Sequence, residues 1–195
     1  MKLGGIDMID IGVVCGRFQI FHKEHLQYVL AAKKKCKYLI IGITSPNGAA
    51  GKLEGADVHR GEKASNPCTF FERMSIIRDV LLGEGIEREE FDIVPYPIET
   101  LELIHYYIPD GVCHFITILD QWGTYKKQRI ESLGYPVEVL WNSKKKGISS
   151  TMIRQAIYHH EEWKKYVPEK TYQYIVDNNI DIRIRGLIDN EFTIS

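Results

Sequence analysis

Apolar residues along the chain fall alternately into short unbroken runs and into segments with helical spacing. The unbroken runs are rich in β-branched residues and predict buried parallel strands at 8–16, 38–45, 91–98, 112–119 and 136–141. Apolar residues that recur every three or four positions predict helices at 22–35, 69–81, 100–108, 125–134 and 168–178. The segment 142–157 runs from a basic loop into a further helix. This alternation predicts an α/β fold, a doubly wound parallel sheet in a single domain spanning residues 1–195.

Two segments depart from the alternation. Residues 46–67 are rich in glycine, asparagine, serine and charge, and we expect a long loop that acts as a lid or moves. Residues 168–195 are expected to form a C-terminal helix followed by a tail. In the stretch "TFFE", Thr69 and Glu72 have the spacing of a capping box, which marks the start of the helix that follows.

Composition and charge narrow the class of protein without identifying it. The chain has 195 residues, 44% hydrophobic and 26% charged, as is usual for a globular domain. Its formal net charge of -1 argues against a nonspecific nucleic-acid binder, and its apolar runs are too short for a membrane span or a signal peptide. The four cysteines form no CxxC pair, so we expect reduced thiols and no metal site. We therefore expect a cytoplasmic protein without nucleic-acid or membrane partners, and leave a homo-oligomer open.

The stretch "GRFQIFHKEH" follows the first predicted strand directly. Because parallel strands point their carboxyl ends at the ligand-binding edge of the sheet, these residues are well placed for a site. Gly16 allows a close approach to the backbone, and Arg17 offers a planar cation for phosphate oxygens. His22 and His25 share one face of a helix start, where free backbone N–H groups favour an anion. The alternative is a pair of histidines that merely cap the helix.

The stretch "KKKGISSTMIR" lies past the last long strand and has a similar character. The lysines 144–146 precede a glycine, and Ser149, Ser150 and Thr151 lie at an apparent N-cap, with Arg154 one turn later. Hydroxyls, helix N–H groups and cations that converge in this way suit a β,γ-phosphate tail. The alternative is a basic surface loop followed by an ordinary N-cap. Two such stretches at one edge of a sheet favour a triphosphate site more strongly than either does alone.

These stretches carry a resemblance to a known family. "GRFQIFHKEH" resembles the GRFQPFHxGH motif of the HxGH nucleotidyltransferases, and "GISSTMIR" resembles their ISSTxIR motif. "NPCTFFERM", at 66–74, is similar to a stretch of the archaeal-type nicotinamide-nucleotide (NMN) adenylyltransferases. The resemblance spans roughly residues 10 to 176 and implies a Rossmann-like doubly wound sheet of the nucleotidyltransferase type.

The resemblance also implies a reaction and its participants. A phosphate monoester attacks the α-phosphate of a nucleoside triphosphate in line, and pyrophosphate leaves with the help of Mg²⁺. The triphosphate is ATP or CTP, and the partner is a small phosphate-bearing acceptor. Carried over by position, the catalytic residues are His22, His25 and Arg154. The nucleotide-binding residues are Gly16, Arg17, Phe18, Ser149, Ser150, Thr151 and Asp120. Such chemistry depends on positioning and charge neutralisation, which agrees with the lack of a nucleophilic dyad.

The chain departs from the family pattern at several positions. Ile20 stands in place of the motif proline, and Glu24 in place of the motif glycine, which puts a carboxylate beside the expected phosphates. The segment 100–108 lacks the tryptophan that stacks on nicotinamide in archaeal-type enzymes. Rings that could replace it belong to His105, Tyr106, Tyr107 and Trp122. Candidates for further contacts with the nucleotide are Arg73, His59 and Arg60.

Four functions follow, in the order in which the sequence favours them. The first is transfer of AMP from ATP to NMN. The second is a cytidylyltransferase, or another adenylyltransferase, that acts on a different phosphate or phosphonate acceptor. The third, motivated by Glu24, is a nucleotide-binding regulator with impaired catalysis. The last is a relative of class I aminoacyl-tRNA synthetases, for which 195 residues leave no room for an anticodon-binding domain.

Overall fold

A computed structural model describes residues 8–47, 62–142 and 147–194 of the chain. Five parallel strands form one sheet in the order β3-β2-β1-β4-β5. The strands are β1 (Ile9–Gly16), β2 (Cys36–Thr44), β3 (Phe91–Tyr96), β4 (Cys113–Ile118) and β5 (Val137–Asn142). The chain builds outward from β1 to β3 and then returns to the other side of β1 to form β4. The switch point therefore lies between the carboxyl ends of β1 and β4, where doubly wound sheets bind ligands.

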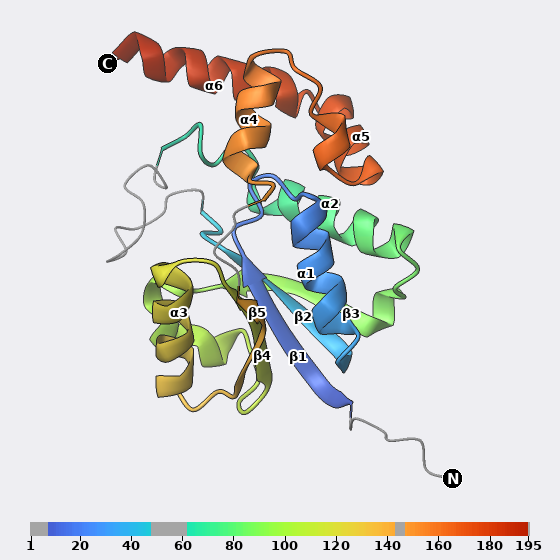
Figure 1. Cartoon of the computed structure of the whole chain (residues 1–195), viewed down its shortest axis with the longest axis vertical. Helices are drawn as coiled ribbons and strands as arrows, with labels where there is room; N and C mark the ends of the chain where they lie inside the picture. Colours follow the sequence, from blue (N-terminus) through green and yellow to red (C-terminus); the bar gives the residue numbers. More distant parts are fainter. Residues whose placement is uncertain (1–7, 48–61, 143–146, 195) are drawn as a thin grey trace.

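Helices cover both faces of the sheet and the end at which the strands have their carboxyl termini (Figure 1). On one face lie α1 (Lys23–Lys33) and α2 (Phe70–Gly83), and on the other η3 (Ile98–Tyr106) and α3 (Gln121–Ser132). Beyond the carboxyl edge lie α4 (Ser150–Tyr158), α5 (Glu169–Asp177) and α6 (Ile180–Ile194). Two single-turn 3₁₀ helices, η2 (Arg88–Glu90) and η4 (Lys164–Tyr166), complete the connections. The predicted doubly wound α/β fold is confirmed.

Alternation within the strands produces two separate cores. On β1, Val14 faces the cluster formed with α1 and α2, whereas Val13 and Cys15 face the cluster formed with η3 and α3. Successive side chains of a strand point to opposite faces, so an apolar residue at every position signals burial on both sides. The unbroken runs in the sequence have this cause.

The segment predicted as a helix over 100–108 is instead the 3₁₀ helix η3, which begins at Ile98 and is interrupted at Thr100 (φ -127°, ψ 62°). Its buried residues Ile98, Leu101 and Ile104 recur at intervals of three. Residues three apart eclipse one another in a 3₁₀ helix, whereas an α-helix turns them progressively away from the core. The three-residue interval favours the tighter helix.

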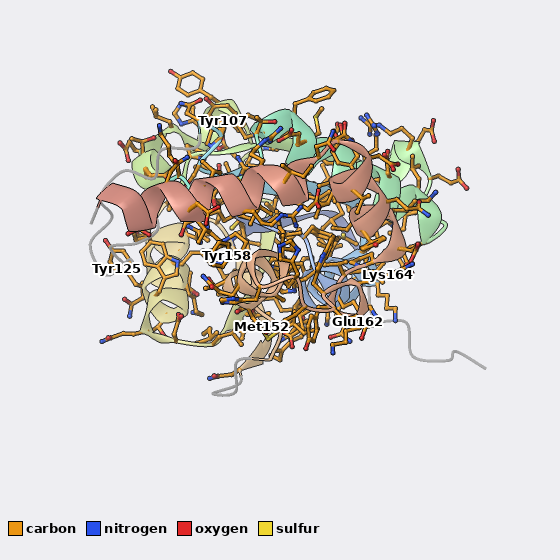
Figure 2. All side chains as sticks on the ribbon, turned by 90° about the horizontal axis from the view of Figure 1, so that it is seen from above. Tyr107, Tyr125, Met152, Tyr158, Glu162 and Lys164 are labelled. Carbon is orange, nitrogen blue, oxygen red and sulfur yellow. The ribbon has the colours of Figure 1, made fainter. Side chains whose placement is uncertain are left out.

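The residues predicted as a C-terminal tail form the helix α6, so the prediction of a single helix followed by a tail is wrong in this part. Ile180, Ile184 and Ile188 are all buried at intervals of four, and their packing against the core stabilises the helix. Asn179, at φ 55°, separates α5 from α6. Tyr158 of α4 donates a hydrogen bond to Asp189 of α6, and Figure 2 shows Tyr158 next to α6.

The predicted capping box at the start of α2 is confirmed. Thr69 Oγ1 accepts the N–H of Glu72, and Glu72 Oε2 accepts the N–H of Thr69. Glu72 also forms an ion pair with Arg183 of α6, whose Nη1 lies 2.8 Å from Glu72 Oε2. The box therefore anchors the C-terminal helix in addition to starting α2.

All four cysteines are unpaired, as predicted, and three of them are buried. Burial raises the pKa of the Cys36 thiol to about 11 and that of Cys68 to about 12. Across residues 8–47, 62–142 and 147–194, none of the helices has the length and apolarity to cross a membrane.

His114 lies inside the core on β4, with 1% of its surface exposed. Its ring packs edge-on against Tyr135 and Tyr96, at centroid distances of 5.0 and 6.0 Å. Neither ring nitrogen has a hydrogen-bond partner among the described residues. Burial therefore lowers the pKa of His114 from 6.5 to about 4, since a buried imidazolium is costly.

We expect His114 to make the fold acid-sensitive. Between pH 6.5 and pH 4, His114 is protonated in the unfolded chain but stays neutral in the folded protein. The free energy of unfolding therefore falls as the pH drops towards 4. The difference between the two pKa values corresponds to about 3 kcal/mol. Urea denaturation between pH 7 and pH 4 should show a smaller loss for His114→Phe than for the wild type. An unchanged pH dependence in that variant, with the exposed His105→Phe as control, would contradict this account.

Candidate functional site

The first motif forms the turn between β1 and α1, and its two histidines begin the helix. His22 is the N-cap residue, and its Nδ1 accepts the backbone N–H of His25 at 3.4 Å. His25 Nδ1 accepts the N–H of His22 at the same distance. The two rings stack with centroids 3.6 Å apart and planes inclined by 21°. The alternative in which these histidines cap the helix is thus realised, but the cap uses only one nitrogen of each ring.

This reciprocal cap fixes the tautomer of both histidines. A nitrogen that accepts a hydrogen bond carries no proton, so the proton of each neutral ring lies on Nε2. Burial lowers the pKa of His22 from 6.5 to about 4. The pKa of His25 is lowered well below 6.5, first by burial and then by His22, while the carbonyl of Ile20 acts in the opposite direction. Near neutral pH both rings are therefore uncharged Nε2–H donors.

Phe18 supports the histidine pair from the interior. Its ring is 2% exposed and meets the ring of His25 edge-on, at 5.0 Å and 89°. A side chain on Gly16 would come within 2.7 Å of the Phe18 ring, so the glycine makes room for this aromatic contact. The predicted nucleotide-binding role of Phe18 stays a prediction. The buried ring acts on the site through His25.

Arg73 of α2 lies beneath the same turn and is 1% exposed. Its guanidinium donates to four backbone carbonyls, those of Thr69, Arg17, Thr44 and Ser45, at 2.9 to 3.2 Å. Burial lowers its pKa to about 10, so it stays charged near neutral pH. Arg73 therefore holds the ends of β1 and β2 to α2 from inside the protein. The roles predicted for it, a surface partner or a phosphate contact, do not fit this buried position.

The second motif begins α4 and is tied directly to the first. Ser149 is the N-cap, and its Oγ accepts the N–H of Met152 at 3.2 Å. Ser150 Oγ donates to the carbonyl of Ile20 at 3.0 Å. The buried Arg154 donates through Nη1 to the carbonyl of Gln19 and through Nη2 to Thr151 Oγ1.

These contacts join residues about 130 positions apart in the sequence and bring the N-termini of α1 and α4 together at the carboxyl edge. The prediction that the two motifs meet there is confirmed. The prediction that Ser150, Thr151 and Arg154 hold phosphates remains a prediction.

Glu24 makes a third contact between the motifs. Its Oε1 accepts the backbone N–H of Ile148 at 2.9 Å. From the sequence, a carboxylate at this position is expected to repel the phosphates unless it points away from them or helps to hold Mg²⁺. In the structure, the carboxylate turns towards the residues that precede α4.

Asp120 lies at the same edge of the sheet, just past β4. It is the N-cap residue of α3, and its Oδ1 accepts the N–H of Gly123 at 3.0 Å. Its predicted contact with a nucleotide stays a prediction. The predicted contributions of residues 144–146, of His59 and of Arg60 fall outside the described residues.

The proposed replacements for the missing tryptophan are surface residues of η3 or lie at the start of α3. Tyr106 is 74% exposed and Tyr107 41% exposed, and the His105 ring tilts against that of Tyr106 at 4.2 Å. Trp122 is half-buried and pairs with Tyr125 at 5.6 Å. In the view of Figure 2, Tyr107 and Tyr125 lie on opposite sides of α6.

Sequence reasoning missed the ties that assemble the site. Gln19 is buried, and its amide both donates to the carbonyl of Cys68 and accepts the N–H of the same residue. A glutamine in an apolar stretch was the available signal, since a buried amide requires partners. No sequence pattern indicates which backbone groups it meets.

A metal site built by the protein usually needs several histidine, cysteine, aspartate or glutamate side chains that converge on one point. Within the described part of the chain, no group of three or more histidines, cysteines, aspartates and glutamates converges on one point.

Similarity to known proteins extends over most of the chain. Residues 13–156 match the model of the family described as cytidylyltransferase-like. The chain is 37% identical over 175 residues to a phosphonoformate cytidylyltransferase of Streptomyces viridochromogenes, covering 90% of this chain and 95% of that protein. It is 25% identical over 181 residues to a nicotinamide-nucleotide adenylyltransferase of Saccharolobus solfataricus, covering 92% and 98%.

A solved structure supports the same fold. The structure superposes on a bifunctional NMN adenylyltransferase/ADP ribose pyrophosphatase from Francisella tularensis with a TM-score of 0.69 and 21% sequence identity. The match covers 96% of this chain and 55% of the other protein, so the chain spans about half of that relative. At this level of identity the likeness shows the fold alone.

Proposed function

Because the chain belongs to the cytidylyltransferase-like family and is an enzyme of the nucleotidyltransferase type, we propose that it transfers CMP from CTP to a small phosphonate. Phosphonoformate, in which a carboxylate is joined directly to phosphorus, is the proposed acceptor or a close model of it. One observation carries the proposal. The starts of two helices, α1 and α4, are tied together at the switch point of the sheet by Ser150 and Arg154, and helix starts favour anions.

The choice of CTP and of a phosphonate rests on the comparisons. The cytidylyltransferase of Streptomyces viridochromogenes is 37% identical to this chain, whereas the adenylyltransferase of Saccharolobus solfataricus is 25% identical over a similar length. Cytidylyl transfer to a phosphonate, the second hypothesis from the sequence, is therefore our leading proposal.

In this reaction an oxygen of the phosphonate attacks the α-phosphorus of CTP. A P–O–P anhydride forms between phosphonate and CMP, and the bond from the α-phosphorus to the bridging oxygen breaks, so pyrophosphate leaves with the electron pair. His22 and His25, as neutral Nε2–H donors, would stabilise the charge that builds up on the α-phosphate oxygens. The first-turn N–H groups of α4 and the hydroxyl of Thr151 would bind the β- and γ-phosphates.

Mg²⁺ would enter as part of the triphosphate complex. The ion prefers oxygen ligands and keeps several waters, so phosphate oxygens supply most of what it requires. When bound, it neutralises charge on the leaving pyrophosphate. The protein's own residues, at the starts of α1 and α4, would hold the phosphates in position.

Transfer of AMP to NMN is the second candidate. It is supported by the NMN adenylyltransferase of Pyrococcus furiosus, 26% identical over 180 residues, in addition to the relative from Saccharolobus solfataricus. The "NPCTFFERM" stretch, shared in pattern with the archaeal-type enzymes, favours it as well.

A panel of substrates separates the two candidates. The protein would be incubated with Mg²⁺, with CTP or ATP, and with phosphonoformate or NMN, and the release of pyrophosphate followed. We expect the highest kcat/KM for CTP with phosphonoformate, at least tenfold above ATP with NMN. Faster turnover of ATP with NMN would replace the first candidate by the second, and pyrophosphate release that needs no acceptor would contradict both.

A further inference from the structure

Glu24 occupies the position at which the HxGH motif has glycine, yet its carboxylate is engaged within the protein. It lies in the first turn of α1, directly before His25, and is half-buried. Its Oε1 accepts the N–H of Ile148, 124 positions further along the chain, at 2.9 Å. A carboxylate that accepts a backbone N–H at a helix start is stabilised there by the helix dipole as well.

Gly147 fits this carboxylate closely. A Cβ at this position would lie 1.9 Å from Glu24 Oε1 and 2.9 Å from Cδ, which is too near for any real contact. Its backbone is outside the left-handed region that favours glycine, so the local conformation alone would accept other residues. A side chain at this position would have to displace the Glu24 carboxylate from the N–H of Ile148, so Glu24 and Gly147 form a matched pair.

The pair acts on the end of α4 that the proposed reaction uses. Ile148 immediately precedes the N-cap Ser149, and its side chain packs against the main core. Ser150 and Arg154 tie α4 to the first motif from within the helix, whereas Glu24 ties the residues that lead into it. These three contacts fix the position of α4 and the direction in which its free N–H groups point.

We propose that Glu24 is a positioning residue that, together with Gly147, sets the start of α4 for binding of the triphosphate tail. This inference rests on the proposed function, because it assigns the start of α4 to the triphosphate. It gives the departure from the motif glycine a role in the site. Loss of the hydrogen bond should weaken triphosphate binding and raise KM, with a smaller effect on kcat.

Three variants test the hydrogen bond. Glu24→Ala removes the acceptor, and we expect the affinity for CTP, measured by calorimetry, to fall about tenfold. Glu24→Gln keeps an oxygen acceptor and should stay within about threefold of the wild type. Glu169→Ala removes a first-turn acid of the remote helix α5 and serves as the matched control. Equal losses in the alanine and glutamine variants, or tighter binding in Glu24→Ala, would overturn the proposal.

A double-mutant cycle tests the pair itself. Gly147→Ala should weaken CTP binding in the wild type, because the methyl group displaces the carboxylate, but should add little loss in the Glu24→Ala background. Additive losses would overturn the pairing.

An activity-independent measurement separates this inference from the proposed function. Hydrogen exchange of the Ile148 amide, followed by NMR, should be faster in Glu24→Ala than in Glu24→Gln and the wild type. With that result and the CTP losses above, failure of phosphonate turnover would count against the proposed reaction alone. Normal turnover and CTP affinity in Glu24→Ala would count against Glu24 alone.

Discussion

Replacing His25 with alanine is expected to lower kcat for nucleotidyl transfer by about two to three orders of magnitude, the usual effect of removing one preorganised donor from a transition state. In the structure, His25 Nδ1 is occupied by the backbone N–H of His22, and the ring is held between that imidazole and Phe18. The Nε2–H donor is therefore fixed before substrate binds, so its loss should affect kcat more than KM. Steady-state release of pyrophosphate measures both constants.

Two further substitutions separate catalysis from capping of α1. His25→Asn places an oxygen near the position of Nδ1, so it should preserve the start of the helix without restoring activity. His25→Gln reaches further and offers an N–H near the position of Nε2, so it should retain more activity than His25→Asn. Circular dichroism and thermal unfolding would verify that all three proteins are folded. Activity of His25→Ala within threefold of the wild type would contradict the assigned role.

Replacing Arg73 with methionine should destabilise the fold by at least about 3 kcal/mol. Four hydrogen bonds from the guanidinium to backbone carbonyls would be lost, and carbonyls left buried without a donor cost about 1–3 kcal/mol each, although such costs are not additive. Thr44 and Ser45, whose carbonyls it holds at the end of β2, are 9% and 5% exposed. Water therefore has little access to replace the lost donor. Urea denaturation of the two proteins measures the difference.

Arg78→Met is the matched control for Arg73→Met. Arg78 belongs to the same helix α2, but its side chain is 40% exposed and pairs with Asp79 on the surface. Its replacement should change the free energy of unfolding by less than about 0.5 kcal/mol. A loss of less than 1 kcal/mol in Arg73→Met would show that the carbonyls find other donors, and that Arg73 is not the tie described above.

Periodicity in the sequence was sufficient for the sheet and for most helices, because burial on both faces leaves unbroken apolar runs such as Ile9–Gly16. It was insufficient where one pattern fits two structures. In "IDIRIRGLID", isoleucines at 180, 182 and 184 also alternate as in a strand, and packing against the core decides for α6. In η3 the interval of three distinguishes a 3₁₀ helix from an α-helix only weakly, so the boundary at Ile98 was missed.

The composition of the candidate site was predictable from its motifs, whereas its internal ties were not. The resemblance supplied His22, His25 and the residues at the start of α4, because phosphate chemistry requires donors at helix starts. The side chains of Arg73, Gln19 and Glu24 bind backbone groups 28 to 124 positions away, and backbone groups leave no residue-specific signal in a sequence. Glu24 illustrates the difference, since its partner is the N–H of Ile148 and only Gly147 beside it hints at the contact.

The central claim is that the tied starts of α1 and α4 bind a triphosphate whose α-phosphorus is attacked. ³¹P NMR of the protein with Mg²⁺, CTP and phosphonoformate tests this most directly, because it identifies the bond that breaks. We expect equal amounts of pyrophosphate and of a new anhydride with two coupled phosphorus signals, and formation of both about two to three orders of magnitude more slowly with His25→Ala. Appearance of CDP with orthophosphate, which would mean attack at the γ-phosphorus, or unchanged CTP with every acceptor in the panel, would contradict it.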